Sequence, residues 1–304
     1  DPVVDPDVPA PQFITIATGS PGGVYYPLGA AMAVMIGRMT DHRAAAESTG
    51  ASVENSRLVG AGDVTLGLAM GSVAYKATQG EAPFEEAIPL KALLNMYASP
   101  LHFLTVEGTG IYTIGDLRGR KISIDVPGSG CNVQSRAVLE AYGFCLDEDL
   151  TIAELSQPEG VRALIDGVID AMTLQAAFPA AGVIEVAAMR PLVLIPITQE
   201  LFDKVDAKMP AIVPVTIPAG TYEGVDYDVF AIGDSNPIIV RYDMPDWLAY
   251  ELTRVIHENV FEGRWALVNA HPIAAQIVPE LSVHTPIPLH PGAIKFFEEQ
   301  GVLP

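Results

Sequence analysis

The sequence predicts an α/β fold, because short apolar runs alternate along the chain with runs whose apolar residues have helical spacing. Hydrophobic residues make up 49% of the 304 residues and charged residues 18%, which suits two apolar cores rather than a disordered chain. Strands that alternate with helices pair mostly in parallel and carry helices on both faces of the sheet. We therefore expect two domains, each a mostly parallel sheet flanked by helices.

The first strand and helix of this pattern are an apolar run at 13–18 and a helix over 24–38, separated by a glycine-rich turn. Leu28, Met32 and Ile36 recur at helical spacing and predict the buried face of that helix. The same pattern predicts strand and helix pairs at 44–48 and 53–59, 64–70 and 73–77, 121–126 and 132–142, and 169–174 and 180–188.

The alternation of strands and helices is interrupted twice. Two strand-like runs, 90–97 and 101–106, adjoin without a helix, and 212–217 is followed by another strand-like run at 228–240. Such paired strands are typical of two domains joined by two segments, with crossovers expected near 105–110 and 217–229. The predicted organisation is a leader over 1–12, a discontinuous first domain over 13–107 plus 225–304, and an inserted second domain over 108–224. A long helix over 247–261 is expected to return to the first domain.

The charge of the chain excludes a nucleic-acid binder. Acidic residues number 37 and basic residues 17, which gives a net charge of −20 that would repel a polyanion. An acidic surface of this kind keeps a protein soluble, and we expect a monomer. The first twelve residues are acidic and rich in proline, as in the linker that remains after a secretory signal is cleaved. We therefore expect an extracytoplasmic, periplasmic location with the signal peptide removed.

Metal, disulfide and dinucleotide sites are not predicted. Cys131 and Cys145 flank a predicted helix of about 17 Å, whereas bridged Cα atoms lie within about 7 Å, so both should be free thiols. The six histidines lack metal-ligand spacing. The Gly-Ser-Gly turn at 128–130 lacks the third glycine of a dinucleotide fingerprint. We expect no cofactor and no metal.

Three polar, glycine-rich turns fall where a strand hands over to a helix, at 18–27, 48–55 and 127–132. Small residues there let backbone N–H groups at a helix N-terminus approach a ligand, and such groups favour an anion such as a carboxylate. Each turn alone could also be an ordinary turn in which Ser48, Ser52 or Ser129 caps the helix that it begins. Taken together, the three turns favour a cleft at the carboxyl ends of the strands.

These turns offer donors and acceptors without a nucleophile and its base, which suits binding better than catalysis. A pocket could be walled by tyrosines, although about half of them would be core residues: Tyr25, Tyr26, Tyr75, Tyr97 and Tyr222. Arg57, Lys76 and Arg136 lie near the turns in sequence and could meet a further ligand charge. For Arg57 and Arg136, a solvated or salt-bridged helix face is the favoured interpretation.

Several motifs in one order resemble the TAXI family, the extracytoplasmic solute receptors of TRAP (tripartite ATP-independent periplasmic) transporters. The resemblance extends from about Phe13 to Gly301. The segments that carry it are 22–27 (GGVYYP), 48–55 (STGASVEN), 116–121 (DLRGRK), 127–130 (PGSG), 216–222 (TIPAGTY) and 286–293 (PIPLHPGA).

The resemblance implies a two-lobed periplasmic-binding-protein-like fold of type II that closes on a solute about two hinge strands and delivers it to a membrane permease. It implies a small carboxylate ligand: glutamate or glutamine, 2-oxoglutarate or a related C4–C5 dicarboxylate. Together with the polar turns and the tyrosines, the resemblance assigns ligand-binding roles to the following residues: Ser20, Gly22, Gly23, Val24, Tyr25, Ser48, Thr49, Ser52, Asn55, Tyr97, Gly128, Ser129, Gly130, Cys131, Gln175 and Tyr222.

Two departures from the family pattern bear on specificity. Cys131 stands where a small hydroxyl residue is expected, and Gln175 stands in a segment that more usually has a glycine before the proline. Gln175 could offer its amide to the ligand or cap the next helix. Two other functions stay open: a bilobed enzyme that uses a Cys131 thiolate at a helix N-terminus, and a sensor subunit for a signalling partner.

Overall fold

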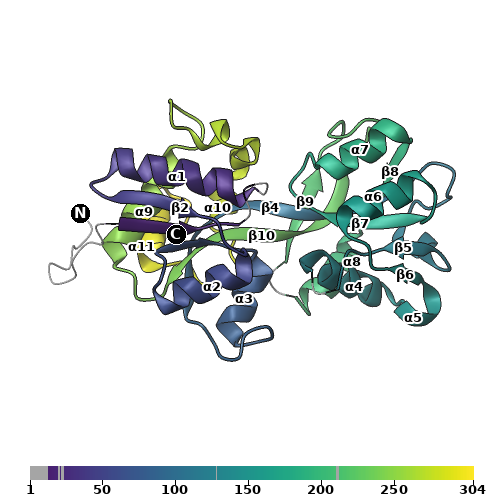
Figure 1. Ribbon diagram of the computed structural model, residues 1–304, viewed down its shortest axis with the longest axis horizontal. Helices are drawn as coiled ribbons and strands as arrows, with labels where there is room; N and C mark the ends of the chain where they lie inside the picture. Colours follow the sequence, from purple (N-terminus) through teal and green to yellow (C-terminus); the bar gives the residue numbers. More distant parts are fainter. Residues whose placement is uncertain (1–12, 20, 22–23, 128, 210–211) are drawn as a thin grey trace. The chain divides into compact units, whose positions relative to one another are not determined.

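The computed structural model describes residues 13–304 apart from 20, 22–23, 128 and 210–211. The expected leader therefore lies outside the described residues, as do four predicted ligand contacts, Ser20, Gly22, Gly23 and Gly128. The chain forms two compact units (Figure 1). Unit 1 contains the chain up to Ala98 together with Ser235–Pro304, and unit 2 contains Ser99–Asp234.

Unit 1 begins with three strands, each followed by a helix. The strands are β1 (Phe13–Ala17), β2 (Arg43–Glu47) and β3 (Leu66–Leu68), and the helices are α1 (Tyr25–Met39), α2 (Ser52–Ala61) and α3 (Gly71–Gln79). β1 pairs in parallel with β2 and with β3, as the alternation predicts. The C-terminal segment adds three helices, α9 (Asp246–Glu258), α10 (Pro279–Ser282) and α11 (Pro291–Glu299).

Alternating side chains of β1 place apolar residues on both faces of the unit 1 sheet. Ala17 packs in a cluster with Val59 of α2 and Ala74 of α3. Ile14 and Ile16 point to the opposite face and are fully buried. Helices α1, α9 and α11 pack together, and Figure 1 shows α1 across the sheet from α2 and α3.

Unit 2 has its own strand and helix pairs. The strands are β5 (Lys121–Ser123), β6 (Thr151–Ala153), β7 (Ala171–Gln175), β8 (Leu192–Leu194) and β9 (Ile212–Ile217). The helices are α4 (Gly130–Tyr142), α5 (Leu146–Asp149), α6 (Gln157–Ile165), α7 (Ala181–Met189) and α8 (Gln199–Asp206). β5 pairs in parallel with β6 and with β7. Helices α4 and α8 contact each other over one apolar cluster, and α6 and α7 do so over another (Figure 1).

Two long strands, β4 (Leu90–Val106) and β10 (Val229–Arg241), continue from one unit into the other. The sequence predicted two runs at 90–97 and 101–106, but the structure has one unbroken strand that passes through Pro100. The unit boundaries consequently fall within the strands, at 98/99 and 234/235 rather than at 107/108 and 224/225. Hydrophobicity marks where a strand is buried, but it cannot mark where a continuous strand changes its neighbours.

The sheets are mixed rather than uniformly parallel. β4 pairs antiparallel with β7 and β8, and β10 pairs antiparallel with β3 and β9. The sequence pattern did not predict β6, α6, β8 and α8. Within the described part of the chain, none of the helices has the length and apolar character needed to span a membrane.

Candidate functional site

In unit 1, the carboxyl ends of three parallel strands pass directly into helix N-termini. β1, β2 and β3 lie side by side, and α1, α2 and α3 begin a few residues after them. The described parts of the turns predicted at 18–27 and 48–55 therefore lie at one edge of this sheet, whereas the turn predicted at 127–132 belongs to unit 2. Each helix start carries backbone N–H groups without helical partners and a partial positive charge of about half a unit.

Asn55 holds this edge together. Its side chain is fully buried, and its Nδ2 group lies 2.7 Å from the carbonyl oxygens of Thr18 and Leu68 and 3.3 Å from that of Ala17. Its Oδ1 accepts a hydrogen bond of 2.6 Å from the Thr49 hydroxyl. The amide thus ties the ends of β1 and β3 to α2. Because its donors and acceptor are engaged within the protein, Asn55 positions the edge in this structure.

The neighbouring hydroxyl residues also bind the loops to one another. Ser48 donates to the carbonyl oxygen of Gly19 at 3.0 Å, and Ser52 accepts from the backbone N–H of Met70 at 3.0 Å. Ser48 and Ser52 therefore do not cap the helix that follows them, which corrects that interpretation of the turn. They fix the spacing between the turns that follow β1, β2 and β3.

A polar cluster from the crossing strands reaches the start of α1. The Tyr25 hydroxyl donates to Oδ1 of Asn236 at 2.7 Å, and the backbone N–H of Asn236 donates to Oδ1 of Asn95 at 2.7 Å. Asn236 also contacts the carbonyl oxygen of Tyr97, whose side chain is only 3% exposed. Burial raises the pKa of the Tyr97 hydroxyl far above its usual value, so this phenol stays neutral. Val24, at the start of α1, is half-buried.

In unit 2, the same arrangement occurs at the carboxyl ends of β5, β6 and β7, which precede α4, α6 and α7. Ser129 is the N-cap of α4, and its hydroxyl accepts from the Asn132 backbone N–H at 3.1 Å. The capping interpretation is thus confirmed for Ser129. Gly130 is the first helical residue and is partly exposed.

Asp125 follows β5 and organises the third turn. It is 8% exposed and has a positive φ of 68°, a conformation that aspartate tolerates better than most residues. Its carboxylate accepts from the Val126 backbone N–H at 2.8 Å and from the Gln157 amide at 3.3 Å. Its carbonyl oxygen accepts from the Asn132 amide at 3.2 Å. The turn is therefore cross-linked to the starts of both α4 and α6.

Gln175, the last residue of β7, is partly exposed and belongs to a polar relay that continues into the interior. Its Nε2 donates to Oε1 of Gln134 at 2.8 Å, and Nε2 of Gln134 donates to the carboxylate of Asp234 at 3.2 Å. Gln134 is 2% exposed and Asp234 is fully buried. Among the described residues, no donor reaches the buried Oε1 atom of Gln175.

Cys131 lies in the first turn of α4 and is 3% exposed. Burial raises the pKa of its thiol to about 11, although hydrogen bonds to Thr173 and Ser135 act in the opposite direction. The thiolate that a nucleophilic cysteine requires is therefore disfavoured at neutral pH, which removes the support for an enzyme built on Cys131. Cys131 and Cys145 are both free cysteines, as predicted.

Tyr222 is a core residue of unit 2. It is 3% exposed, and its hydroxyl accepts from the backbone N–H of Ala180 at 2.9 Å and lies 2.9 Å from Nε2 of His102. Nδ1 of His102 faces the carbonyl oxygen of Leu174 at 3.1 Å, which assigns the proton to Nδ1. Burial lowers the pKa of His102 to about 4 and raises that of Tyr222 to about 12, so both groups are neutral.

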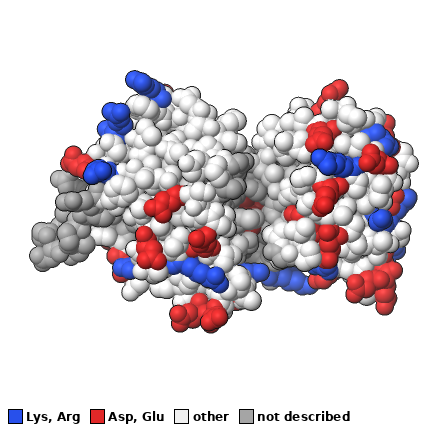
Figure 2. Space-filling model, viewed as in Figure 1, with Lys and Arg blue, Asp and Glu red and all other residues white. Residues whose placement is uncertain are grey.

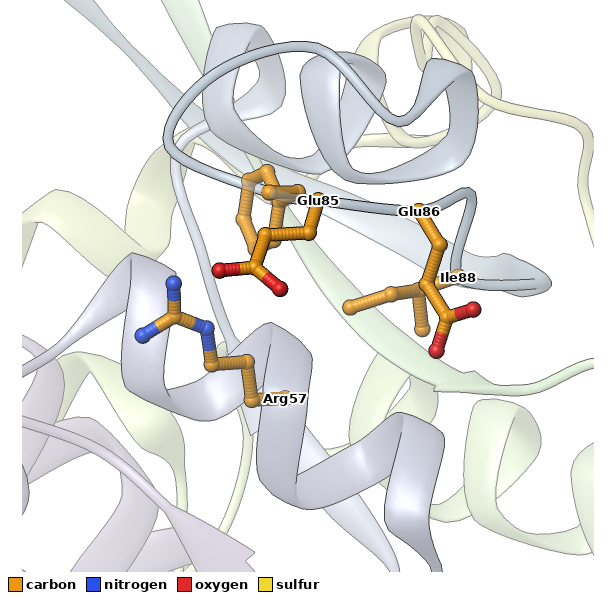
Figure 3. Close-up of a pocket in the computed structure, with 5 residues that line it drawn as sticks. Arg57, Glu85, Glu86 and Ile88 are labelled. Atoms are coloured by element: carbon orange, nitrogen blue, oxygen red, sulfur yellow. The ribbon is translucent and has the colours of Figure 1, made fainter.

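Of the cations noted in the sequence, Arg57 and Arg136 contact other groups of the protein. Arg57 donates to the carbonyl oxygen of Pro83 at 2.8 Å, and its guanidinium lies 5.6 Å from the centre of the Phe84 ring. It lines a cavity of about 410 Å³ together with Glu85 and Glu86 (Figure 3). Two carboxylates against one guanidinium make this cavity unsuitable for an anionic solute.

Arg136 pairs with Glu154 at 2.8 Å, so its expected salt-bridged helix face is confirmed. Lys76 lies in the last turn of α3, away from the carboxyl edge of the sheet. On the face shown in Figure 2, acidic and basic side chains are interspersed over both units. The described residues include no cluster of three or more His, Cys, Asp or Glu residues that could hold a metal ion.

The model of the NMT1-like family matches residues 16–301. The chain belongs to the NMT1-like family. Its fold is that of periplasmic binding proteins, as the similarity to solved structures shows. A TctC solute-binding protein from Polaromonas is 14% identical with a TM-score of 0.60, and the match covers 87% of this chain and 88% of that one.

Two further solved structures share the fold of this NMT1-like chain. One is XAC2383 from Xanthomonas citri, bound to chloride, with 12% identity and a TM-score of 0.55 over 96% of this chain and 98% of that chain. The other is a putative periplasmic sulfonate-binding protein SsuA from Methylobacillus flagellatus, with 12% identity and a TM-score of 0.51 over 96% and 88%. At these identities, the similarity establishes the architecture alone.

Sequence reasoning missed several polar residues of this NMT1-like chain that the structure places at the strand ends. Asp234 and Asn236 interrupt the apolar run of β10, which is a signal that could have been used. Asp125 lies two residues beyond β5, within the strand predicted at 121–126, and could have been found in the same way. Gln134 carried no local signal, because a glutamine in the first turns of a helix is usually exposed.

Proposed function

We propose that this chain is an extracytoplasmic solute receptor of the TAXI type that binds a small carboxylate and delivers it to the permease of a TRAP transporter. The proposed solutes are glutamate or glutamine, 2-oxoglutarate or a related C4–C5 dicarboxylate. The observation that carries the proposal is that parallel strands in both units end at helix N-termini, α1, α2 and α3 in unit 1 and α4, α6 and α7 in unit 2.

An anionic solute fits these helix starts for electrostatic reasons. A helix N-terminus stabilises a nearby negative charge by about 0.3 to 2 kcal/mol, and backbone N–H groups bind carboxylates directly. The net charge of −20 opposes the approach of an anion. Short-range donors therefore have to provide the affinity. The buried, neutral state of Cys131 and His102 supports binding without chemical conversion.

Two proteins of similar fold are described with anionic ligands, which supports the proposed ligand class. The structures of XAC2383 contain chloride in one case and ATP in another, and the Methylobacillus protein is described as sulfonate-binding. The Polaromonas protein is described as solute-binding. Like chloride, ATP and a sulfonate, a carboxylate carries a negative charge.

Closure about β4 and β10 is the proposed binding movement, because these two strands connect the units. A solute that contacts both units would bind a closed form more tightly than an open form, and this difference in affinity would increase the population of the closed form. Small-angle scattering with and without saturating solute measures this movement. The radius of gyration should fall on binding, and an unchanged radius at saturation would contradict closure.

Isothermal titration with glutamate, glutamine, 2-oxoglutarate and succinate tests the ligand class, with glucose as a neutral control. At least one acid should bind, and at a concentration of about 100 times Kd it should stabilise the fold by about 2.7 kcal/mol. If none of the four acids binds, the proposed function is wrong.

Gly130→Pro tests the role of the helix start. Proline is tolerated at the first position of a helix and removes one backbone donor, and the extended Ser129 (ψ 153°) is compatible with a following proline. Affinity should fall roughly tenfold to a hundredfold, as for a lost hydrogen bond to a charged group. Gln199→Pro is the matched control, because α8 also begins after an extended, capping Thr198 (ψ 157°) but does not follow a strand of the parallel set. Equal affinity in both variants would contradict the assignment.

A further inference from the structure

The relay of Gln175, Gln134 and Asp234 is not explained by general binding of an anion. Oε1 of Gln175 is buried, and no donor among the described residues reaches it. A buried acceptor without a donor costs free energy, so such atoms in native proteins usually mark a water or ligand position. The relevant chemistry is therefore that of an acceptor, which requires an N–H or O–H group opposite it.

The Asp234 carboxylate determines the orientation of both amides in the relay. A carboxylate only accepts hydrogen bonds, so Asp234 requires the NH₂ group of Gln134, at 3.2 Å. Gln134 then presents its oxygen to Gln175, which must answer with its own NH₂ group, at 2.8 Å. The amide oxygen of Gln175 is therefore the acceptor that remains without a donor among the described residues. Rotating the Gln175 amide would place two oxygen atoms against each other.

The relay also lies beside the proposed carboxylate position. Gln175 ends β7, and its backbone hydrogen-bonds to the thiol of Cys131, in the first turn of α4. Gln134 belongs to the same helix, one turn from its start. A solute whose carboxylate binds the start of α4 would bring the atoms next to that carboxylate towards Gln175.

From this geometry, which rests on the proposed function, we infer that Gln175 selects carboxylic acids that carry an N–H or O–H donor near the bound carboxylate. Amino acids and hydroxy acids belong to this class. Keto acids and unsubstituted dicarboxylates do not, because they would place an oxygen or a methylene group opposite the Gln175 oxygen. The relay is therefore a specificity device within the broader class of small carboxylates.

Matched pairs of solutes test the inference by titration calorimetry on the full chain. L-glutamate and 2-oxoglutarate differ by an ammonium in place of a keto oxygen, and L-malate and succinate differ by one hydroxyl. In each pair, the acid that carries the donor should bind at least about tenfold more tightly than the other acid. The reason is that it gains one hydrogen bond and satisfies one buried acceptor. Equal affinities within the pairs, or tighter binding of the keto acid or of succinate, would overturn the inference.

Two variants separate the relay from the fold. Gln175→Met keeps the length of the side chain and removes the acceptor, so the preference within each pair should fall to about threefold or less. Asp234→Asn should act at a distance, because an asparagine can accept or donate and so releases both amides to turn over. The preference for the donor-bearing acid should then weaken, or the acid that presents an acceptor should bind more tightly, although Gln175 itself is unchanged. Gln199→Met, at an exposed site on α8, should leave every affinity unchanged.

The outcomes distinguish this inference from the proposed function. If no acid binds to the unaltered chain, the proposed function fails and the inference fails with it. If acids bind without regard to the donor, or if Gln175→Met keeps the full preference, only the inference fails. Thermal unfolding of each variant checks that it is folded, and Gln175→Met decides the question if Asp234→Asn does not fold.

Discussion

The two units present similar strand ends, but they treat the polar groups there differently. In each unit, an asparagine near the start of a helix binds strand-end carbonyl oxygens, Asn55 in unit 1 and Asn132 in unit 2. Asn55 reaches three carbonyl oxygens and Asn132 reaches one. In unit 2, the neighbouring Gln175 keeps a buried acceptor without a donor among the described residues.

This difference indicates a division of roles. In the turns after β1 and β2, the described side chains of Ser48, Thr49 and Asn55 hydrogen-bond within the protein, so these turns can offer mainly backbone groups that recognise any small anion. Unit 1 also has a buried hydroxyl without a described partner, that of Ser235, but it lies within β10 rather than at these turns. The unit 2 edge keeps a side-chain acceptor that can distinguish one acid from another. Of the two asparagines, Asn55 of unit 1 should therefore contribute more to stability, whereas the Gln175 acceptor of unit 2 should contribute to selectivity.

Asn55→Ala should have the largest effect on stability. It leaves three buried carbonyl oxygens and the Thr49 hydroxyl without their partner, and it opens a cavity. We expect a loss of about 4 kcal/mol in the free energy of unfolding, measured by urea denaturation. Asn132→Ala should cost about 1 to 2 kcal/mol, and the exposed Asn269→Ala less than about 0.5 kcal/mol. Similar losses for Asn55 and Asn132 would break the comparison.

The second effect is a loss of stability on acidification, to which His102 in the interior of unit 2 contributes. The folded pKa of His102 is about 4, below its ordinary value of 6.5, so the unfolded chain binds the proton more readily. The stabilising contribution is complete above about pH 6.5 and is lost as the pH falls towards 4. It amounts to about 3 kcal/mol over that range.

Urea denaturation at pH 7 and at pH 4.5 measures this dependence. His257, His271 and His290 of unit 1 contribute in the same direction, because burial also lowers their pKa values. The comparison is therefore between variants. His102→Gln should flatten the pH dependence, whereas the exposed Gln199→Met, which changes no titratable group, should leave it as it is. An equally steep dependence in His102→Gln would place the titrating group elsewhere.

The fold could be predicted from the sequence wherever local patterns decide it. The strand and helix at 13–18 and 24–38 were predicted to within one residue at each end, because hydrophobic spacing and glycine turns fix such elements locally. The helix predicted at 132–142 ends where expected, because Gly143 follows α4 with a positive φ of 108° that glycine adopts without strain. The unit boundaries were misplaced because β4 and β10 are continuous, and continuity of a strand across two units leaves no mark in hydrophobicity.

For the candidate site, the sequence indicated the turns but not the role of each side chain. Asn55 and Tyr222 were predicted as ligand contacts, yet Asn55 is fully buried with its polar groups engaged and Tyr222 is a core residue. Whether a side chain faces a solute or a neighbouring strand depends on contacts between distant segments. Gln134 and Asp234 lie 100 residues apart, so their contact has no local pattern.

Ser129→Ala should have a smaller effect, which sharpens the comparison between the two sets of turns. Ser129 caps α4, and removal of an N-cap hydroxyl costs about 1 kcal/mol. Ser48→Ala in unit 1 should cost about 0.5 kcal/mol or less, because Ser48 is exposed and only ties one loop to Gly19. Thermal unfolding of both variants at pH 7 gives the order. A larger loss for Ser48 would mean that loop spacing, rather than helix capping, dominates at these edges.

The smallest effect concerns two surface ion pairs, one on each unit. The Arg136–Glu154 pair of unit 2 and the Arg254–Glu258 pair of unit 1 are similarly exposed, and each should contribute about 0.5 kcal/mol in a double-mutant cycle. Arg136 also donates to Oδ1 of Asn132 at 3.1 Å and thereby orients the amide that binds Asp125. Arg136→Ala should therefore reduce the free energy of unfolding by a few tenths of a kcal/mol more than Arg254→Ala. Salt at 0.5 M should screen the ion-pair contribution, which the two variants have in common, and leave this difference. If salt abolishes the difference, Arg136 acts as a surface charge alone and does not support the third turn.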